Sequence, residues 1–232
     1  MRLNRFVTIA ASVIGALHGP ALANDPAHPT VVELYQSQGC SSCPPAIANI
    51  NLLAARPDVL ALTFAVTYWD QLGWKDTFAR PAFTQRQWDF ARAAGRGNVA
   101  TPQTVINGRT VTNGGDRAQL IAAIRAADRG DTGPSITATS GKVRVAAADA
   151  KRSATIWLVR YDARSIDVPI RAGENGGRTI AHRNVVRSLS LLGQWNGRET
   201  VVTVPPGGNP NLRSAILVQS GTGGPIIAAA KL

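Results

Sequence analysis

The stretch VLALTFAV at residues 59–66 constrains the fold of this 232-residue chain more than any other segment. All of its residues except Thr63 are apolar. A strand with one face in water alternates apolar and polar side chains, whereas a strand covered on both faces is apolar nearly throughout. The stretch therefore predicts a strand inside a sheet that is covered on both sides, as in α/β folds.

The segments on either side of this strand alternate between strand-like and helix-like patterns through the first half of the chain. Further strands are predicted at residues 30–36 and on both sides of an Asn107-Gly108 hairpin turn. Pro44, Pro81 and Asp116 suit the first positions of helices. Apolar residues at helical spacing predict three of them, at residues 44–58, 81–95 and 115–130.

The pattern changes after residues 131–134, which read DTGP. Short runs of alternating apolar and polar residues follow, separated by breaks such as GENGG (173–177) and PPGGNPN (205–211). This pattern is typical of all-β structure. We therefore expect a domain at residues 24–131, followed at residues 132–232 by a smaller, sandwich-like all-β C-terminal module.

Cys40 and Cys43 are the only cysteines in the chain, and they stand between a predicted strand and a predicted helix. Backbone N–H groups at a helix N-terminus stabilise an anion, so the pKa of the first thiol falls. Cys40 would attack a substrate disulfide. Cys43, one turn away and more buried, would then resolve the mixed disulfide.

Two other roles stay open for this pair. A structural disulfide between them would close a loop of only four residues, which contributes little stability. A metal site needs more ligands than the chain offers, because the only histidines beyond the first 23 residues are His28 and His182. Glu174 and His182 have acid–base potential, but no active-site pattern surrounds them. A lone histidine in a polar loop is more often a surface residue, which is how we interpret His182.

Glu33 lies in the predicted strand at residues 30–36, on the same strand face as Val31 and Tyr35. A carboxylate among apolar residues is desolvated, which raises its pKa. Such a group would accept a proton from Cys43 while the mixed disulfide is resolved. The alternative is an edge strand that leaves Glu33 in water.

An aromatic stretch after residue 66 supplies a candidate substrate-binding group, because ligands gather at strand ends in α/β sheets. Lys75 near a thiolate would lower the thiol pKa further, and the aromatic rings would bind an unfolded or extended polypeptide. In the alternative, the two tryptophans pack on the sheet and the charged residues cap turns. The group consists of Tyr68, Trp69, Asp70, Trp74, Lys75 and Asp76.

Thr101 and Pro102 precede the apolar strand that begins at Gln103. A cis bond between them would turn the chain sharply and place the Thr101 backbone beside another loop. A trans proline at the start of a strand is the commoner arrangement.

The order of strand, CxxC, helix, strand, inserted helix, TPQTVING, hairpin and closing helix resembles the thioredoxin fold. The resemblance implies an α/β thioredoxin-like domain with a helical insertion at about residues 67–98. It also implies a nucleophilic Cys40, a resolving Cys43 and a buried carboxylate at Glu33. Thr101 and Pro102 would form the loop that packs against the CxxC and docks the substrate.

A closer resemblance rests on VVELYQSQGCSSCPP, YWDQLGWKD, PAFTQRQ, TPQTVINGR and GENGGRTIAHRNVVRSLSLLGQWNG. Together these segments resemble the secreted bacterial family catalogued as domain of unknown function 1223, over nearly the whole chain after residue 23. The resemblance implies a thioredoxin-like domain with a β-rich C-terminal part. It brings no established substrate.

The first 23 residues have the features of a secretory signal, with Arg2 and Arg5 ahead of an apolar run and Ala21-Leu22-Ala23 at the end. We therefore expect a periplasmic or secreted protein with no stable membrane span after cleavage; a retained N-terminal anchor is the alternative. The net charge of +11 is carried by scattered residues without a stripe of stacking aromatics, which argues against nucleic-acid binding.

These features predict an exported thiol–disulfide oxidoreductase that exchanges disulfides with extracytoplasmic proteins through its CxxC pair. It would use an unidentified redox partner and no cofactor beyond its own dithiol, and it would bind no metal. The alternative is a non-catalytic binding module with a thioredoxin fold, in which the disulfide stays permanently oxidised.

Overall fold

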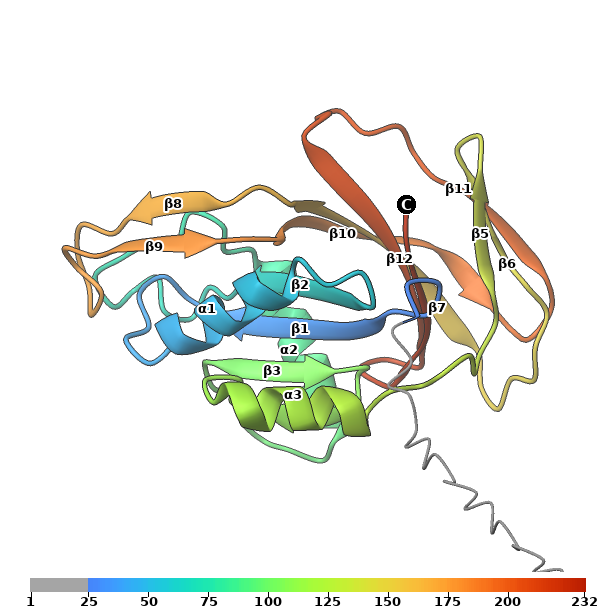
Figure 1. The fold of residues 1–232 in the computed structure, drawn as a ribbon, viewed down its shortest axis with the longest axis horizontal. Coiled ribbons are helices and arrows are strands. Elements are labelled where there is room, and N and C mark those ends of the chain that lie inside the picture. The colour runs from blue at the N-terminus through green and yellow to red at the C-terminus, as the bar shows by residue number, and fades with distance from the viewer. Residues whose placement is uncertain (1–24) are drawn as a thin grey trace, which may run out of the picture.

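One mixed sheet of eight strands forms the centre of the structure, a computed structural model that describes residues 25–232 (Figure 1). The predicted secretory signal at residues 1–23 lies outside the described residues. From one edge to the other, the sheet consists of β13 (Ile226–Lys231), β12 (Leu212–Ser220), β7 (Ala154–Asp162), β10 (Val185–Trp195), β2 (Val59–Ala65), β1 (Thr30–Gln36), β3 (Gln103–Ile106) and β4 (Thr110–Thr112).

Two smaller sheets and three helices complete the described part of the chain (Figure 1). One small sheet has three strands, in the order β11 (Thr200–Thr203), β6 (Lys142–Val145) and β5 (Ile136–Thr139). The other is a hairpin of β8 (Ile166–Pro169) and β9 (Thr179–His182). The helices are α1 (Pro44–Leu53), α2 (Pro81–Ala93) and α3 (Arg117–Ala126). Within residues 25–232, none of them is long and apolar enough to cross a membrane.

The predicted fold class, an α/β thioredoxin-like domain with a helical insertion before a separate sandwich-like module, is wrong. The structure is mostly β, with helices of only 10, 13 and 10 residues. Strands from both halves of the chain share the large sheet, because β10 pairs in parallel with β2 through Val185 and Thr63. Periodicity reveals strands but not which distant strand each one joins. The division of the chain at residues 131 and 132 stays a prediction.

Each face of the large sheet has its own core. On one face, α1 and α3 cover β1 and β2 through a cluster that includes Val32 and Leu34. The three-stranded sheet covers the distant part of this face around the buried Trp195. On the opposite face, α2 packs through Phe83 and Phe90. β1 and β2 are buried along their whole lengths, which confirms the inner strand predicted from the apolar run.

A buried ion pair fixes α2 to the sheet. Nε and Nη2 of Arg86 on α2 each donate a hydrogen bond of 2.8 Å to the carboxylate of Glu33 on β1. The Tyr35 hydroxyl donates to the same carboxylate at 2.7 Å, and Nη1 of Arg86 donates to Gln219 at 2.9 Å. Burial lowers the pKa of Arg86 and the Glu33 charge raises it, with a net rise. The pair is thus satisfied by hydrogen bonds on both sides.

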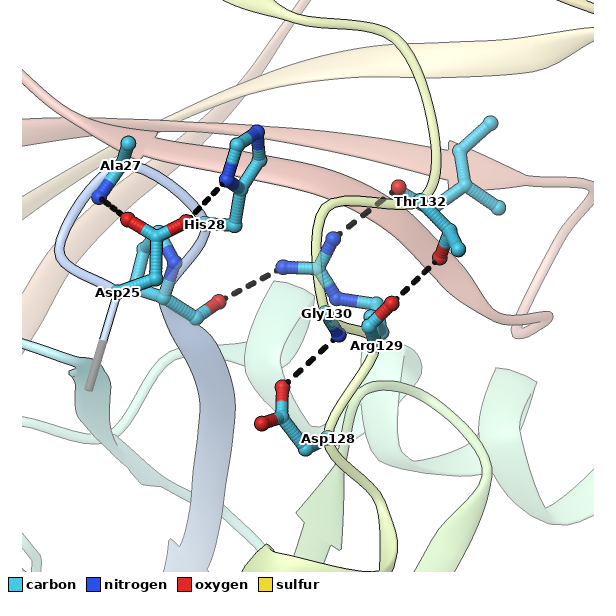
Figure 2. Close-up of polar contacts among 9 residues, drawn as sticks. Asp25, Ala27, His28, Asp128, Arg129, Gly130 and Thr132 are labelled. Carbon is cyan, nitrogen blue, oxygen red and sulfur yellow. Dashed lines mark hydrogen bonds and ion pairs between the residues drawn. The ribbon is translucent and has the colours of Figure 1, made fainter. Parts of the chain in front are cut away.

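Arg129, just after α3, forms hydrogen bonds with segments near both ends of the described chain (Figure 2). Its guanidinium donates to the carbonyl of Pro29 at 2.7 Å and to the carbonyl of Ile227 at 3.1 Å. Pro29 directly precedes β1, and Ile227 belongs to β13. The contact therefore links the close of the α3 segment to strands that are far apart in the sequence.

Replacing Arg86 with methionine should reduce the free energy of unfolding by about 3–5 kcal/mol, because Glu33 would be left as an uncompensated buried charge. Denaturant titration measures the loss. The double variant Glu33→Leu/Arg86→Met should recover part of it, since no charge is then left buried. Arg92→Ala is the matched control, because its ion pair with Asp89 leaves the Arg92 side chain 61% exposed and should contribute at most about 1 kcal/mol. Equal losses from Arg86→Met and Arg92→Ala would contradict a buried pair.

His182, at the end of β9, should make stability depend on pH. The interpretation of His182 as a surface residue is wrong, because its imidazole is fully buried against Phe78. Its Nδ1 lies 3.0 Å from the carbonyl oxygen of Ile180, and its Nε2 has no partner among the described residues. Burial lowers the pKa of His182 from 6.5 to about 4. The unfolded chain thus binds a proton at a higher pH than the folded chain. The contribution of the neutral histidine to the free energy of unfolding is complete above pH 6.5 and is lost as the pH falls toward 4.

The variant His182→Gln has no imidazole to protonate. The difference in unfolding free energy between wild type and His182→Gln should therefore shift by about 2–3 kcal/mol between neutral pH and about pH 4.5, with the wild type losing more. Urea titrations of both proteins at the two pH values give this difference. A difference that stays constant would show that the imidazole is not held neutral in the fold.

Candidate functional site

Cys40 and Cys43 form a disulfide at the junction between β1 and α1. Cys43 directly precedes Pro44, the first residue of α1, and its carbonyl accepts the first helical hydrogen bond from the N–H of Ile47 at 3.0 Å. No side chain caps this helix start. The loop before α1 is closed by a bond of 3.1 Å from the Cys43 N–H to the Cys40 carbonyl. The sequence-predicted position of the pair, between a strand and a helix, is confirmed.

Ser42 connects the disulfide to the loop at Thr101 and Pro102. Its hydroxyl lies 3.3 Å from Sγ of Cys40 and 3.5 Å from the carbonyl oxygen of Thr101. The Thr101-Pro102 peptide bond is cis. Four of the predicted site residues therefore lie close together, namely Cys40, Cys43, Thr101 and Pro102. Both cysteines are fully buried, so the expected contrast between an accessible Cys40 and a more buried Cys43 is not found.

Glu33 is not brought to the disulfide. Alternate residues of β1 point to opposite faces, and Val32 and Leu34 pack in the same cluster as Cys40 and Cys43. Glu33 points to the other face, where Arg86 holds its carboxylate. The predicted proton relay from Glu33 to Cys43 is therefore not supported. The alternative of an exposed edge strand fails as well, because β1 lies between β2 and β3 and Glu33 is fully buried.

The aromatic stretch supports the loop that leads into the cysteine pair. The indole N–H of Trp74 donates to the side chain of Gln38 at 2.9 Å. The Asp76 carboxylate accepts from the Gln38 backbone N–H at 2.7 Å and from the N–H of Phe78 at 2.8 Å. Asp70 in turn accepts from the N–H of Asp76 at 3.1 Å. Trp74 and Asp76 thus contact Gln38, two positions before Cys40, whereas Asp70 contacts Asp76.

Other members of the predicted substrate-binding group lie elsewhere. Trp69 is partly buried against the cores on both faces of the sheet, whereas Tyr68 packs only in the core under α2 and donates to Gln87 at 3.3 Å. Lys75 is exposed and makes no salt bridge with any residue that the structure describes. The group is therefore divided between both sheet faces and the surface.

Asp76 is a buried carboxyl that the structure places beside this loop. It is 3% exposed, and burial raises its pKa to about 6 against the opposing effect of the backbone N–H donors. A carboxyl with this pKa changes its protonation state near neutral pH, so Asp76 has the acid–base property that the sequence suggested for Glu33.

Two residues of the C-terminal half contact the cysteine loop directly, and the sequence did not identify them as site residues. Nδ2 of Asn175 donates to the carbonyls of Gln38 at 2.9 Å and of Cys40 at 2.8 Å. The Glu174 carboxylate accepts from the backbone N–H of Ser41 at 2.9 Å. Hydrogen bonding to Ser41, first by its side chain and then by its backbone, lowers the pKa of Glu174. The sequence singles out Glu174 only for its acid–base potential, and both residues lie in the polar break GENGG, which is equally typical of an ordinary turn.

The site as a whole can exchange two electrons through the disulfide. Its ligand-type side chains do not gather around a common point, since residues 25–232 hold no group of three or more His, Cys, Asp or Glu suited to a metal ion. The disulfide, the serines between its cysteines and the backbone of the Thr101 loop are thus the chemical elements of the site.

Comparison with solved structures supports the fold. The chain is similar to the crystal structure of protein AGR_C_4864 from Agrobacterium tumefaciens, with 29% identity and a TM-score of 0.74 over 88% of this chain and 93% of that one. HBP35 of Porphyromonas gingivalis is similar over 88% of this chain and 74% of that one, with 10% identity and a TM-score of 0.56, and shares only the fold.

Comparison with protein sequences confirms the family resemblance. No curated protein was found to match the chain. The family model described as protein of unknown function, DUF1223, matches residues 31–219, which is most of the chain. The protein therefore belongs to the DUF1223 family.

Proposed function

We propose that this protein is an exported thiol–disulfide oxidoreductase that acts through Cys40 and Cys43. The observation that carries the proposal is the position of the disulfide at the start of α1, where the helix dipole stabilises a thiolate. A structural role for the bond would be weak, because it closes a loop of only four residues.

The exchange would proceed in two steps. In the reduced protein, the Cys40 thiolate attacks one sulfur of a client disulfide, and the other client sulfur leaves as a thiolate. The Cys43 thiolate then attacks Sγ of Cys40, re-forms the Cys40–Cys43 bond and releases the second client thiolate. The client gains two electrons and the protein loses two. The reverse sequence oxidises a client dithiol.

The surroundings of the pair suit a polypeptide client and an extracytoplasmic location. Asp76, whose pKa burial raises to about 6, accepts a hydrogen bond from the N–H of Gln38 two residues before Cys40, and Trp69 and Trp74 supply partly buried aromatic surface beside the pair. Disulfides persist mainly outside the reducing cytoplasm, which supports the predicted secretory signal and a periplasmic or secreted protein. The partners would be protein thiols and disulfides together with a further redox protein.

One observation favours a second candidate function. Both cysteines are fully buried, so a client disulfide reaches Cys40 only if the loop opens. A sulfur that stays covered is typical of an inert disulfide. In that case the protein would be a non-catalytic binding module, and replacing both cysteines with serine would leave its binding unchanged.

Trapping with single-cysteine variants tests the proposal. The variant Cys43→Ser keeps the nucleophile and lacks the resolving thiol, so it should accumulate a mixed disulfide with a disulfide-bonded model peptide under native conditions. In the matched control Cys40→Ser, the rate of adduct formation should be lower by a factor of about ten, because Cys43 is not the nucleophile of the proposed mechanism. Mass spectrometry of the alkylated products measures both rates. Equal rates, or adducts that form only in denaturant, would contradict the exchange mechanism.

The reduction potential of the wild-type pair provides the second test. A value between about −120 and −270 mV lies within the range of known exchange catalysts. Equilibration in glutathione buffers, followed by alkylation and mass analysis, gives the potential. A value below about −300 mV, or a bond that resists reduction until the protein unfolds, is the behaviour of a structural disulfide and would favour the binding module.

A further inference from the structure

The β8–β9 hairpin brings the C-terminal half of the chain to the cysteine loop. Figure 1 shows this hairpin extending from the large sheet past α1. Two hydrogen bonds attach it to that helix: Nδ2 of Asn51 donates to the carbonyl of Ala181 at 2.8 Å, and the N–H of Arg183 donates to Oδ1 of Asn51 at 2.9 Å. The turn of the hairpin, residues 170–178, is thereby held beside the start of α1.

Asn175 fixes this turn against the loop. It is fully buried, and its amide donates to two loop carbonyls, those of Gln38 and Cys40. Its Oδ1 accepts from Nη1 of Arg178 at 2.9 Å. Gly173 lies against Trp74, where an added Cβ would come within 3.1 Å of the tryptophan Cβ. The position of the turn is thus determined by several contacts rather than by one surface bond.

Glu174 places a negative charge next to Cys40. Its carboxylate accepts a hydrogen bond from the N–H of Ser41, the first backbone donor after that cysteine. The side chain is open to solvent, and hydrogen bonding to the side chain and backbone of Ser41 lowers its pKa, so it is ionised at neutral pH. The carboxylate therefore lies at the backbone N–H that directly follows Cys40.

This charge acts differently on the two redox states. Reduction by two glutathione thiols breaks the Cys40–Cys43 bond and forms one glutathione disulfide, and the two protons of the glutathione thiols pass to the protein or to solvent. The disulfide is neutral, whereas the reduced pair carries a thiolate at Cys40. A nearby like charge disfavours the thiolate. The second carboxylate by the loop, Asp76, accepts from the N–H of Gln38 and is therefore held by a different backbone donor from Glu174.

We propose that Glu174 is a residue of the redox site, where its carboxylate disfavours the Cys40 thiolate and shifts the couple toward the disulfide. Asn175 is the positioning residue that keeps the carboxylate there. This inference rests on the proposed function, because a shifted potential matters only to a protein that exchanges disulfides. It assigns part of the redox site to the C-terminal half of the chain.

The variant Glu174→Gln separates charge from contact, because a glutamine oxygen still accepts from the N–H of Ser41. Equilibration with glutathione should show the equilibrium constant moved about fivefold toward the dithiol, which is about 20 mV toward a more oxidising couple. The pH dependence of Cys40 alkylation should shift in parallel to lower pH. Glu199→Gln is the matched control, since it removes the same charge from an exposed residue that precedes β11 and pairs with Arg144.

A shift of less than about twofold in Glu174→Gln relative to Glu199→Gln would overturn the inference. Asn175→Ala provides the second variant: it retains the carboxylate but releases the turn, and it should shift the equilibrium in the same direction as Glu174→Gln. Thermal melts confirm that each variant folds. This test can fail separately from the test of the proposed function. The proposed function is tested by the reduction potential of the wild type and by the mixed disulfide of Cys43→Ser, whereas the inference is tested by the change in the redox equilibrium constant between variants.

Discussion

The pairing of β10 with β2 is the interaction on which the rest of the structure depends. It is short, with Val185 opposite Thr63, but side chains and backbone reinforce it. The Thr63 N–H donates to the carbonyl of Asn184 at 3.0 Å, and its hydroxyl donates to the carbonyl of Arg183 at 3.0 Å. Nδ2 of Asn184 donates to the carbonyl of Ala61 at 2.7 Å. These bonds join the strands of the two chain halves into a single sheet.

The same pairing explains how the site is assembled. Only Arg183 and Asn184 separate β9 from β10, so fixing the start of β10 at β2 also fixes the β8–β9 hairpin over α1. The hairpin turn then reaches the cysteine loop with Glu174 and Asn175. A loop that begins in the N-terminal half is thus completed by residues more than 130 positions later in the chain.

The buried ion pair and the disulfide lie on opposite faces of the large sheet. The ion pair of Glu33 and Arg86 lies under α2, away from the cysteines, where removing either partner leaves a buried charge. The disulfide, Ser42 and the Thr101 carbonyl lie at the opposite side with α1. The position of Glu33 follows from strand geometry, because a change of one residue along β1 moves a side chain to the other face.

The sequence by itself determined the local features: the buried strand β2, the helix starts at Pro44, Pro81 and Asp116, the Asn107-Gly108 hairpin turn and the CxxC at the junction of strand and helix. These depend on neighbours in the chain, which periodicity and turn residues report. Only the tertiary structure decided that both halves share one sheet, that Glu33 faces Arg86, and that Glu174 and Asn175 contact the cysteine loop. Such contacts join residues far apart in the chain, and a single sequence carries no local pattern for the partner that a distant strand or loop selects.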